Sequence, residues 1–140
     1  MHKDRILMVS HGSLAQAMLD NVEMVLGGQE NVEALCLPRE KTLEDFIEAL
    51  RKELCLYGEE HILFFSDLKN GTPCNALLLL TKEFPGLLHI TGMNMPGVIG
   101  AVLARNSLDT MSIREVCDEA VRAARDGLEE VIFPPAKAGI

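Results

Sequence analysis

The sequence predicts an α/β fold: one three-layer α/β/α domain over residues 1–140, built on a mostly parallel sheet. The chain has 140 residues, which is the usual size of one domain. Hydrophobic residues make up 48% of it, enough to bury a core without disulfides or metals. Short apolar runs alternate with segments of helical periodicity, a pattern typical of parallel strands that are covered by helices on both faces.

Five short apolar runs have the length and composition of buried strands. The first ends at the polar Ser10, the third is the most apolar, and the fifth follows the last helical segment. They span residues 5–10, 32–37, 61–67, 87–91 and 129–133. The sequence contains no internal repeat, low-complexity segment or linker, which favours a single folding unit.

Helical segments lie between the strands, and each begins or ends at a recognisable signal. Ser13 with Gln16 forms a capping-box pattern at the start of the first helix. Thr42 with Asp45 and Ser112 with Glu115 are the expected caps of two further helices. Thr72 is the expected N-cap of a further helix, with Pro73 at its first helical position. The expected helices span residues 14–26, 43–57, 73–84, 96–105 and 113–126.

The charge balance excludes some classes of partner. The chain has 13 basic and 21 acidic residues, a net charge of −8 at pH 7. This disfavours nucleic acid binding, which needs basic side chains against phosphates. It favours a partner with a basic surface, because opposite charges steer the encounter.

The cysteines predict neither a zinc site nor disulfides. They are Cys36, Cys55, Cys74 and Cys117, and no two of them have C-x-x-C spacing. We expect three of them to be small buried hydrophobes. The chain opens without a signal peptide, and its apolar runs are shorter than a membrane span. We therefore expect a cytoplasmic protein with reduced thiols and with no metal or other cofactor.

Polar residues and glycines gather where three of the expected strands end. They follow the first strand at residues 10–13, the third at residues 67–75 and the fourth at residues 92–96. Parallel sheets bind ligands beyond the carboxyl ends of their strands. We therefore expect the functional site at this edge of the sheet.

His11 and Asp67 are the candidate catalytic pair. A histidine at a strand end suits covalent catalysis, because imidazole is nucleophilic near neutral pH. Asp67 could accept the other ring N–H, which would fix the tautomer and stabilise positive charge on the ring. A lone histidine is more often structural, and Asp67 could merely cap a loop. Their positions at matching strand ends favour the catalytic interpretation.

Two helix starts are the candidate phosphate-binding elements. Gly12 and Ser13 lead into the first helix, and Gly71 and Thr72 lead into the third. Free N–H groups and the positive end of a helix dipole bind phosphoryl oxygens, and Thr72 adds a hydroxyl. Thr72 has a capping role in the helix in either case.

Other chemistries fail on spacing. The sequence has neither the P-loop motif nor the dinucleotide-binding glycine pattern. Ser10 and His11 are adjacent on a strand and point to opposite faces, so they do not form a nucleophile–base pair. His61 and His89 lie at the start and in the middle of expected strands, where packing or hydrogen bonding is the expected role.

Three motifs, in order, carry a resemblance to a known family. They are residues 6–12 (ILMVSHG), residues 66–67 with 71–75 (SD and GTPCN), and residues 92–96 (GMNMP). Together they resemble enzyme IIA of the mannose family, the mannose/fructose/sorbose type of the bacterial sugar phosphotransferase system, over roughly residues 5–133.

The resemblance implies a function and a set of partners. His11 would receive a phosphoryl group from the histidine phosphocarrier HPr and pass it to an enzyme IIB, which serves the membrane components of the same transporter. Asp67 would bond the imidazole, and Thr72 would lie in the phosphate pocket. The resemblance also implies a homodimer in which the C-terminal strand, residues 129–133, exchanges between subunits.

Two alternatives on the same fold stay open. One is a phosphorylation-sensing regulatory module. The other is the phosphoryl-donor subunit of a dihydroxyacetone kinase, whose motif usually has serine after the histidine, where this chain has Gly12. The chain departs from the family's pattern at Lys69, Asn70 and Cys74, which bear on partner or sugar specificity more than on the chemistry. Asparagine tolerates a positive φ better than most residues, so we expect the turn at Asn70 to form.

Overall fold

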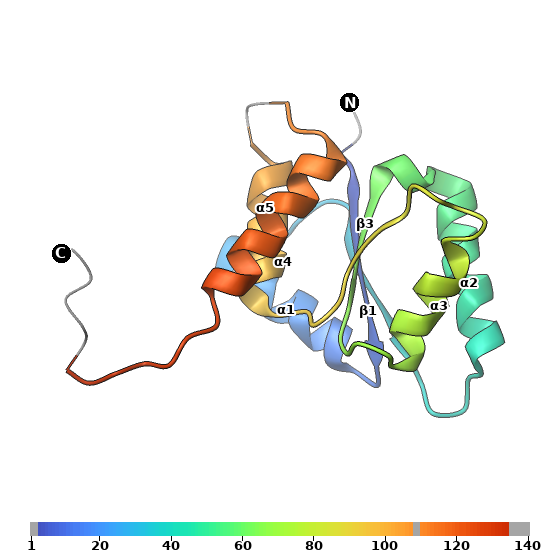
Figure 1. Cartoon of the computed structure of the whole chain (residues 1–140), viewed down its shortest axis with the longest axis horizontal. Helices are drawn as coiled ribbons and strands as arrows, with labels where there is room; N and C mark the ends of the chain where they lie inside the picture. The colour runs from blue at the N-terminus through green and yellow to red at the C-terminus, as the bar shows by residue number, and fades with distance from the viewer. Residues whose placement is uncertain (1–2, 108–109, 135–140) are drawn as a thin grey trace.

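The computed structural model describes residues 3–107 and 110–134. In this part of the chain four strands form one sheet in the order β2-β1-β3-β4, and every pairing is parallel (Figure 1). The strands are β1 (Arg5–His11), β2 (Val32–Leu37), β3 (Ile62–Ser66) and β4 (Leu88–Ile90). The helices are α1 (Leu14–Leu26), α2 (Leu43–Tyr57), α3 (Thr72–Leu80), α4 (Met95–Arg105) and α5 (Ile113–Asp126), with one 3-10 helix, η1 (Glu59–His61).

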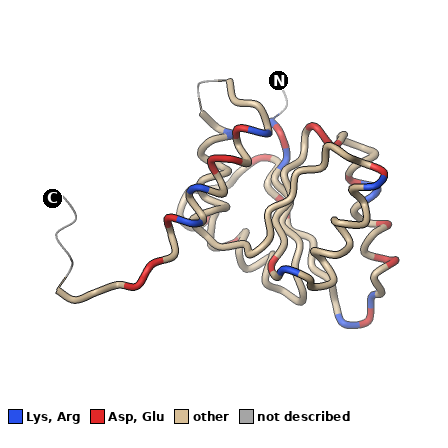
Figure 2. The backbone as a smooth tube through the Cα atoms, in the orientation of Figure 1, with Lys and Arg blue, Asp and Glu red and all other residues tan. Residues whose placement is uncertain are grey.

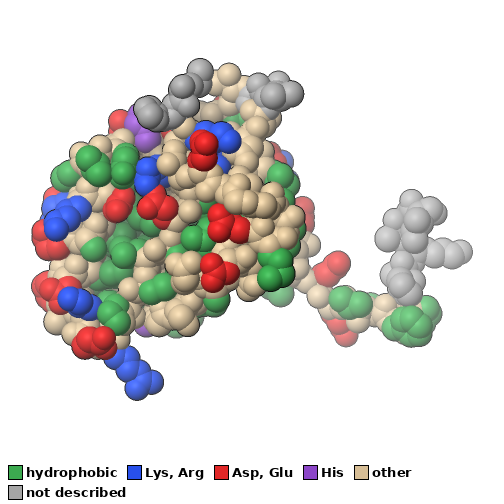
Figure 3. Space-filling view, turned by 180° about the vertical axis from the view of Figure 1, so that it is seen from behind, with side chains coloured by type: hydrophobic (Ala, Val, Ile, Leu, Met, Phe, Trp, Pro, Cys, Tyr) green, Lys and Arg blue, Asp and Glu red, His purple; other side chains and the backbone are tan. Residues whose placement is uncertain are grey.

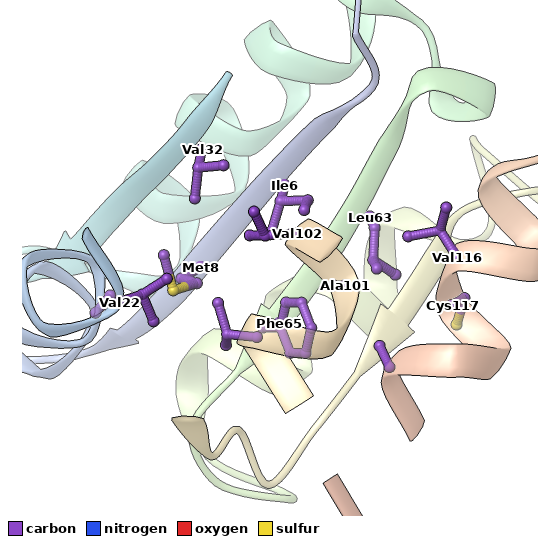
Figure 4. Close-up of a cluster of buried hydrophobic side chains, with 13 residues drawn as sticks. Ile6, Met8, Val22, Val32, Leu63, Phe65, Ala101, Val102, Val116 and Cys117 are labelled. Atoms are coloured by element: carbon purple, nitrogen blue, oxygen red, sulfur yellow. The ribbon is translucent and has the colours of Figure 1, made fainter. Parts of the chain in front are cut away.

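Helices cover both faces of the sheet, so the three-layer α/β/α prediction is confirmed (Figure 1). Successive strand residues point to opposite faces. Met8 and Phe65 pack with α1, α4 and α5 in the core that Figure 4 shows, whereas Phe64 packs with α2 and α3. Burial on both faces explains why β3 is almost entirely apolar.

The predicted caps at Thr42 and Ser112 are confirmed, and both form capping boxes, at the starts of α2 and α5. The predicted box of Ser13 with Gln16 is wrong, because the Ser13 side chain makes no capping hydrogen bond. Instead Oγ of Ser10, buried near the end of β1, accepts a hydrogen bond from the backbone N–H of Ala15 at 2.7 Å. A buried hydroxyl needs a partner, and a free N–H in the first turn of α1 supplies it.

The starts of α3 and α4 differ from the prediction by one residue each. Gly71, not Thr72, is the N-cap of α3, so that Thr72 is the first helical residue and Pro73 the second. Pro73 tolerates the second position because N–H groups in the first helical turn have no partner within the helix. Asn94 caps α4, which therefore begins at Met95.

The fifth predicted strand does not join the sheet. Residues 129–133 follow α5 as an irregular segment that leads away from the body of the domain (Figure 1). Figure 3 shows this segment as hydrophobic side chains next to acidic ones, and Val131 and Phe133 are 88% and 93% exposed. A strand needs a neighbouring strand for its hydrogen bonds, and the described chain brings none to this segment. Within one chain these residues therefore form no strand, and their exchange between subunits stays a prediction.

Burial of the cysteines is confirmed for Cys74 and Cys117. Cys36 on β2 is half-buried, and Cys55 on α2 is exposed. Two cysteines are therefore fully buried, where three were expected. Over the described ranges, none of the helices is both long enough and apolar enough to cross a membrane.

Candidate active site

The carboxyl ends of β1 and β3 bring His11 and Asp67 together. The two strands are neighbours, and their ladder ends with the pair Val9 and Ser66. His11 is the last residue of β1, and Asp67 is the first residue after β3. Parallel strands end at the same edge of a sheet, which is why two side chains 56 positions apart in the sequence meet there.

One carboxylate oxygen of Asp67 contacts two nitrogen atoms of His11. Its Oδ2 lies 2.8 Å from Nδ1 of the imidazole and accepts a hydrogen bond from the backbone N–H of His11 at 2.9 Å. Its Oδ1 accepts a hydrogen bond from the backbone N–H of Leu68 at 2.9 Å. The side chain of Asp67 is 9% exposed and that of His11 is 47% exposed. The carboxylate is therefore fixed, while part of the ring faces solvent.

The carboxyl of Asp67 is held in its ionised form. Partial burial by itself raises its pKa, but the hydrogen bonds from the ring and the backbone of His11 outweigh burial and leave the pKa below its ordinary value. A carboxylate beside Nδ1 favours the neutral tautomer that carries its proton on Nδ1. The lone pair then lies on Nε2, the nitrogen that is free to attack an electrophile.

Gly71 forms the surface on which the imidazole ring lies. A Cβ atom at residue 71 would stand 2.6 Å from Cε1 of His11 and 3.3 Å from Nε2. Carbon atoms in van der Waals contact are normally about 3.5–4.0 Å apart. Only glycine therefore leaves room for the ring in this position.

Nε2 consequently lies beside the first turn of α3, of which Gly71 is the N-cap. The N–H groups of Thr72 and Cys74 have no carbonyl partner within the helix, and Pro73 has no N–H. Free N–H groups and the positive end of the helix dipole favour an anion at this point. The hydroxyl of Thr72 adds a further donor in the same turn.

The loop before α3 is a tight turn held by two hydrogen bonds. The N–H of Gly71 donates to the carbonyl of Leu68 at 3.0 Å, and Nδ2 of Asn75 donates to the carbonyl of Asn70 at 3.2 Å. Asn70 has a φ of 67°, which confirms the prediction that the turn forms with asparagine at this position. Sequence reasoning assigned no role to Asn75, because asparagine in the first turns of a helix carries no signal of its own.

Gly12 and Ser13 follow His11 directly. Gly12 has a φ of 51° and turns the chain from β1 into α1. Its N–H donates to the carbonyl of Leu37 at 3.0 Å, so this amide is occupied. Ser13 is exposed at the start of α1. His11, Asp67 and the start of α3 therefore lie in direct contact, whereas Gly12 is a turn residue.

The two other histidines in the described ranges have structural contacts, as expected. His61 lies in η1, before β3, with Nδ1 3.0 Å from Oδ1 of Asp4. His89 lies within β4, and Nε2 of its ring forms a hydrogen bond with Oγ of Ser66 at 2.6 Å. A hollow of about 580 Å³ lies between β4 and α5, at the side of the sheet rather than at His11. Among the described residues, no group of His, Cys, Asp or Glu side chains is arranged to hold a metal ion.

Comparison with known proteins identifies relatives in the bacterial phosphotransferase system (PTS). The family model EIIA-man, described as "PTS system fructose IIA component", matches residues 5–121. The PTS sorbose-specific EIIA component of Klebsiella pneumoniae is 32% identical over 108 residues, which are 77% of each chain. The PTS mannose-specific EIIAB component of Escherichia coli strain K12 is 29% identical over 133 residues, which are 94% of this chain and 41% of that protein. The chain thus spans about two fifths of the length of the EIIAB relative.

Solved structures share the fold. The EIIA component from Streptococcus agalactiae superposes with a TM-score of 0.80 at 25% identity, over 90% of this chain and 95% of that one. The mannose/sorbose-specific IIA subunit from Enterococcus faecalis gives a TM-score of 0.82 at 23% identity, over 97% and 100% of the two chains. With the match of the family model to most of its length, the chain belongs to the EIIA-man family of PTS IIA components.

Proposed function

We propose that this chain is a phosphocarrier of a sugar phosphotransferase system and that Nε2 of His11 carries the phosphoryl group. HPr is the donor and an enzyme IIB the acceptor, in the cytoplasm beside the membrane components of the transporter. Family membership supports the class of reaction. The geometry around one imidazole supports the choice of residue.

The observation that carries the proposal is that Nε2 has no hydrogen-bond partner among the residues that the structure describes. Asp67 occupies Nδ1 at 2.8 Å, and the ring packs on Gly71 at the start of α3. One nitrogen therefore has a permanent carboxylate partner, and the other faces a helix end suited to an anion. His61, by contrast, lies at the other end of β3.

In the transfer, the lone pair of Nε2 attacks phosphorus while the phosphorus–nitrogen bond of the donor phosphohistidine breaks, and the electron pair of that bond returns to the donor ring. No proton leaves His11, because Nε2 carries none. The ring gains positive charge, which Asp67 stabilises through Nδ1–H. The N–H groups of Thr72 and Cys74 and the Thr72 hydroxyl are suited to bind the phosphoryl oxygens. The same displacement, with an enzyme IIB nucleophile, passes the group on.

We also propose that residues 129–133 complete a homodimer by joining the sheet of a second copy. Exposed apolar side chains at Val131 and Phe133 support this, because a group of this kind is rarely left in water (Figure 3). β4 is an edge strand, and the hollow beside it runs along α5. Light scattering during size-exclusion chromatography should give the mass of a dimer, and deletion of residues 129–140 should give a monomer.

The phosphorylation test uses enzyme I, HPr and phosphoenolpyruvate, followed by measurement of the intact mass. One acid-labile phosphoryl group should appear on the wild-type chain and on His61→Ala, and none on His11→Ala. A phosphoryl group that persists in His11→Ala, or a wild-type chain that receives none, would overturn the proposal.

A further inference from the structure

A set of polar side chains, of which Ser66 is buried and His89 and Thr91 are partly buried, lies next to Asp67. Ser66, the residue before it, has 0% of its surface exposed. Its hydroxyl donates a hydrogen bond to Oγ1 of Thr91 at 2.8 Å and lies 2.6 Å from Nε2 of His89. A serine hydroxyl buried without partners is destabilising, so these contacts explain how a polar residue stands at the end of an apolar strand.

These side chains extend the pairing of β3 and β4 beyond its last backbone pair. The parallel ladder ends with Phe65 and Ile90, one residue before Ser66. Residues two apart on a strand share a face of the sheet, so His89 and Thr91 both point to the side of Ser66. The carbonyl of Ser66 also accepts a hydrogen bond from the N–H of Met93 at 3.0 Å. Ser66 is therefore anchored to the segment of β4 through both its hydroxyl and its carbonyl.

The His89 ring suits this role in its neutral form. Burial lowers its pKa to about 4, so the ring carries a single N–H at neutral pH. With the Ser66 proton directed at Thr91, Nε2 of His89 is the donor to Oγ of Ser66. Each of the three side chains then has a partner for its polar group.

We propose that His89 is a positioning residue for the phosphoryl site, and that through Ser66 it fixes the strand end from which Asp67 reaches His11. The inference rests on the proposed phosphocarrier function. Functional side chains must be held within about 0.5 Å of their productive geometry. Without the His89 contact, Thr91 is the one side-chain partner that Ser66 keeps among the described residues. The 2.8 Å contact between Asp67 and Nδ1 of His11 then loses part of its support.

The test compares His89→Leu, which removes the ring nitrogen, with His89→Gln, whose side-chain amide reaches the same place. Ile62→Val is the matched control, because Ile62 is buried at the other end of β3 and lies in the core beneath α2 and α3. Nitrogen-15 NMR reports the tautomer of His11 at neutral pH, rapid quench reports the rate of transfer from phospho-HPr, and a thermal melt reports folding.

We expect His89→Leu to lower the transfer rate about tenfold, because small misplacements of reacting groups are costly, and to raise the fraction of the His11 tautomer protonated at Nε2. His89→Gln should keep the transfer rate and the tautomer fraction close to their wild-type values. Ile62→Val should change neither the rate nor the tautomer fraction. Because His89 acts through Ser66, the double variant Ser66→Ala/His89→Leu should be little slower than either single variant.

The outcomes separate this inference from the proposed function. If His89→Leu leaves both the tautomer and the rate at wild-type values, the inference is overturned and the phosphocarrier stands. If the wild-type chain receives no phosphoryl group, the proposed function is overturned. The tautomer comparison still decides whether His89 positions Asp67. If His89→Leu does not fold, Ser66→Ala removes the same contact from its other side, and unchanged readouts there overturn the inference.

Discussion

Gly71→Ala tests the site at its most constrained point. The backbone at Gly71 has φ −78° and ψ 167°, which alanine adopts without strain. The added methyl group would nevertheless stand 2.6 Å from Cε1 of His11. The ring is about half exposed and ends a flexible side chain, so it can swing away, and we expect little change in the melting temperature.

The magnitude follows from the distances. Normal contact between carbons is about 3.5–4.0 Å, so the ring must retreat by roughly 1 Å. That movement breaks the 2.8 Å contact of Nδ1 with Asp67 or carries Nε2 away from the start of α3. A misplacement of about 1 Å can cost about 100-fold in rate, which corresponds to about 2.7 kcal/mol. We expect phosphoryl transfer to Gly71→Ala to fall by about this factor.

Rapid-quench transfer from phospho-HPr measures the effect, with a thermal melt of the same sample. Gly28→Ala is the matched control, because a Cβ at Gly28 meets no atom within 4 Å and its φ is not in the left-handed range. That variant should transfer at the wild-type rate. A wild-type rate in Gly71→Ala would show that the imidazole does not lie against residue 71 when it reacts. The reasoning about the ring would then fail.

Two further predictions concern charge. Asp67→Asn keeps the size of the side chain but can donate to Nδ1 and support the wrong tautomer, so transfer should fall roughly 10²–10³-fold, less than the 10⁴ known for the corresponding change in serine proteases. The pKa of Asp67 is lowered in the folded chain, which adds stability. This stability is fully present above the pKa of an aspartate in the unfolded chain, about 3.9, and is lost as the pH falls through the pKa of Asp67 in the folded chain. The melting temperature of Asp67→Asn should therefore depend less on pH below 4, and an unchanged acid profile would contradict this assignment. The net charge is −8, and Figure 2 shows the charged residues distributed over helices and loops. This charge should steer a basic donor towards the chain. The on-rate for HPr should therefore fall as salt shortens the Debye length to about 10 Å at 0.1 M. A salt-independent on-rate would mean that apolar contacts dominate docking.

The sequence predicted the architecture and the meeting of His11 with Asp67 for one physical reason. Burial on both faces makes parallel strands recognisable as apolar runs, and their common edge places the residues that follow them together. The errors arose where the sequence signal leaves the backbone conformation or the pairing partner unspecified. The Ser13 cap failed because the backbone there has φ −93° and ψ 6°, not the extended conformation of a capping residue. The buried Ser10 hydroxyl instead accepts a hydrogen bond from the N–H of Ala15. The apolar pattern of residues 129–133 indicates strand propensity, but it does not say which strand would lie beside it.

Neighbouring residues of the loop between β3 and α3 have separate roles. Gly71 is both the N-cap of α3 and the surface beneath the imidazole, so a side chain there would displace the ring. Asn70 supplies the positive φ of the turn, and its carbonyl is held by Asn75. Lys69 is exposed and has no hydrogen bond or ion pair among the described residues. A change at Asn70 therefore acts on the shape of the turn and through it on the ring. A change at Lys69 leaves the turn intact and alters the charge that a docking protein meets beside His11.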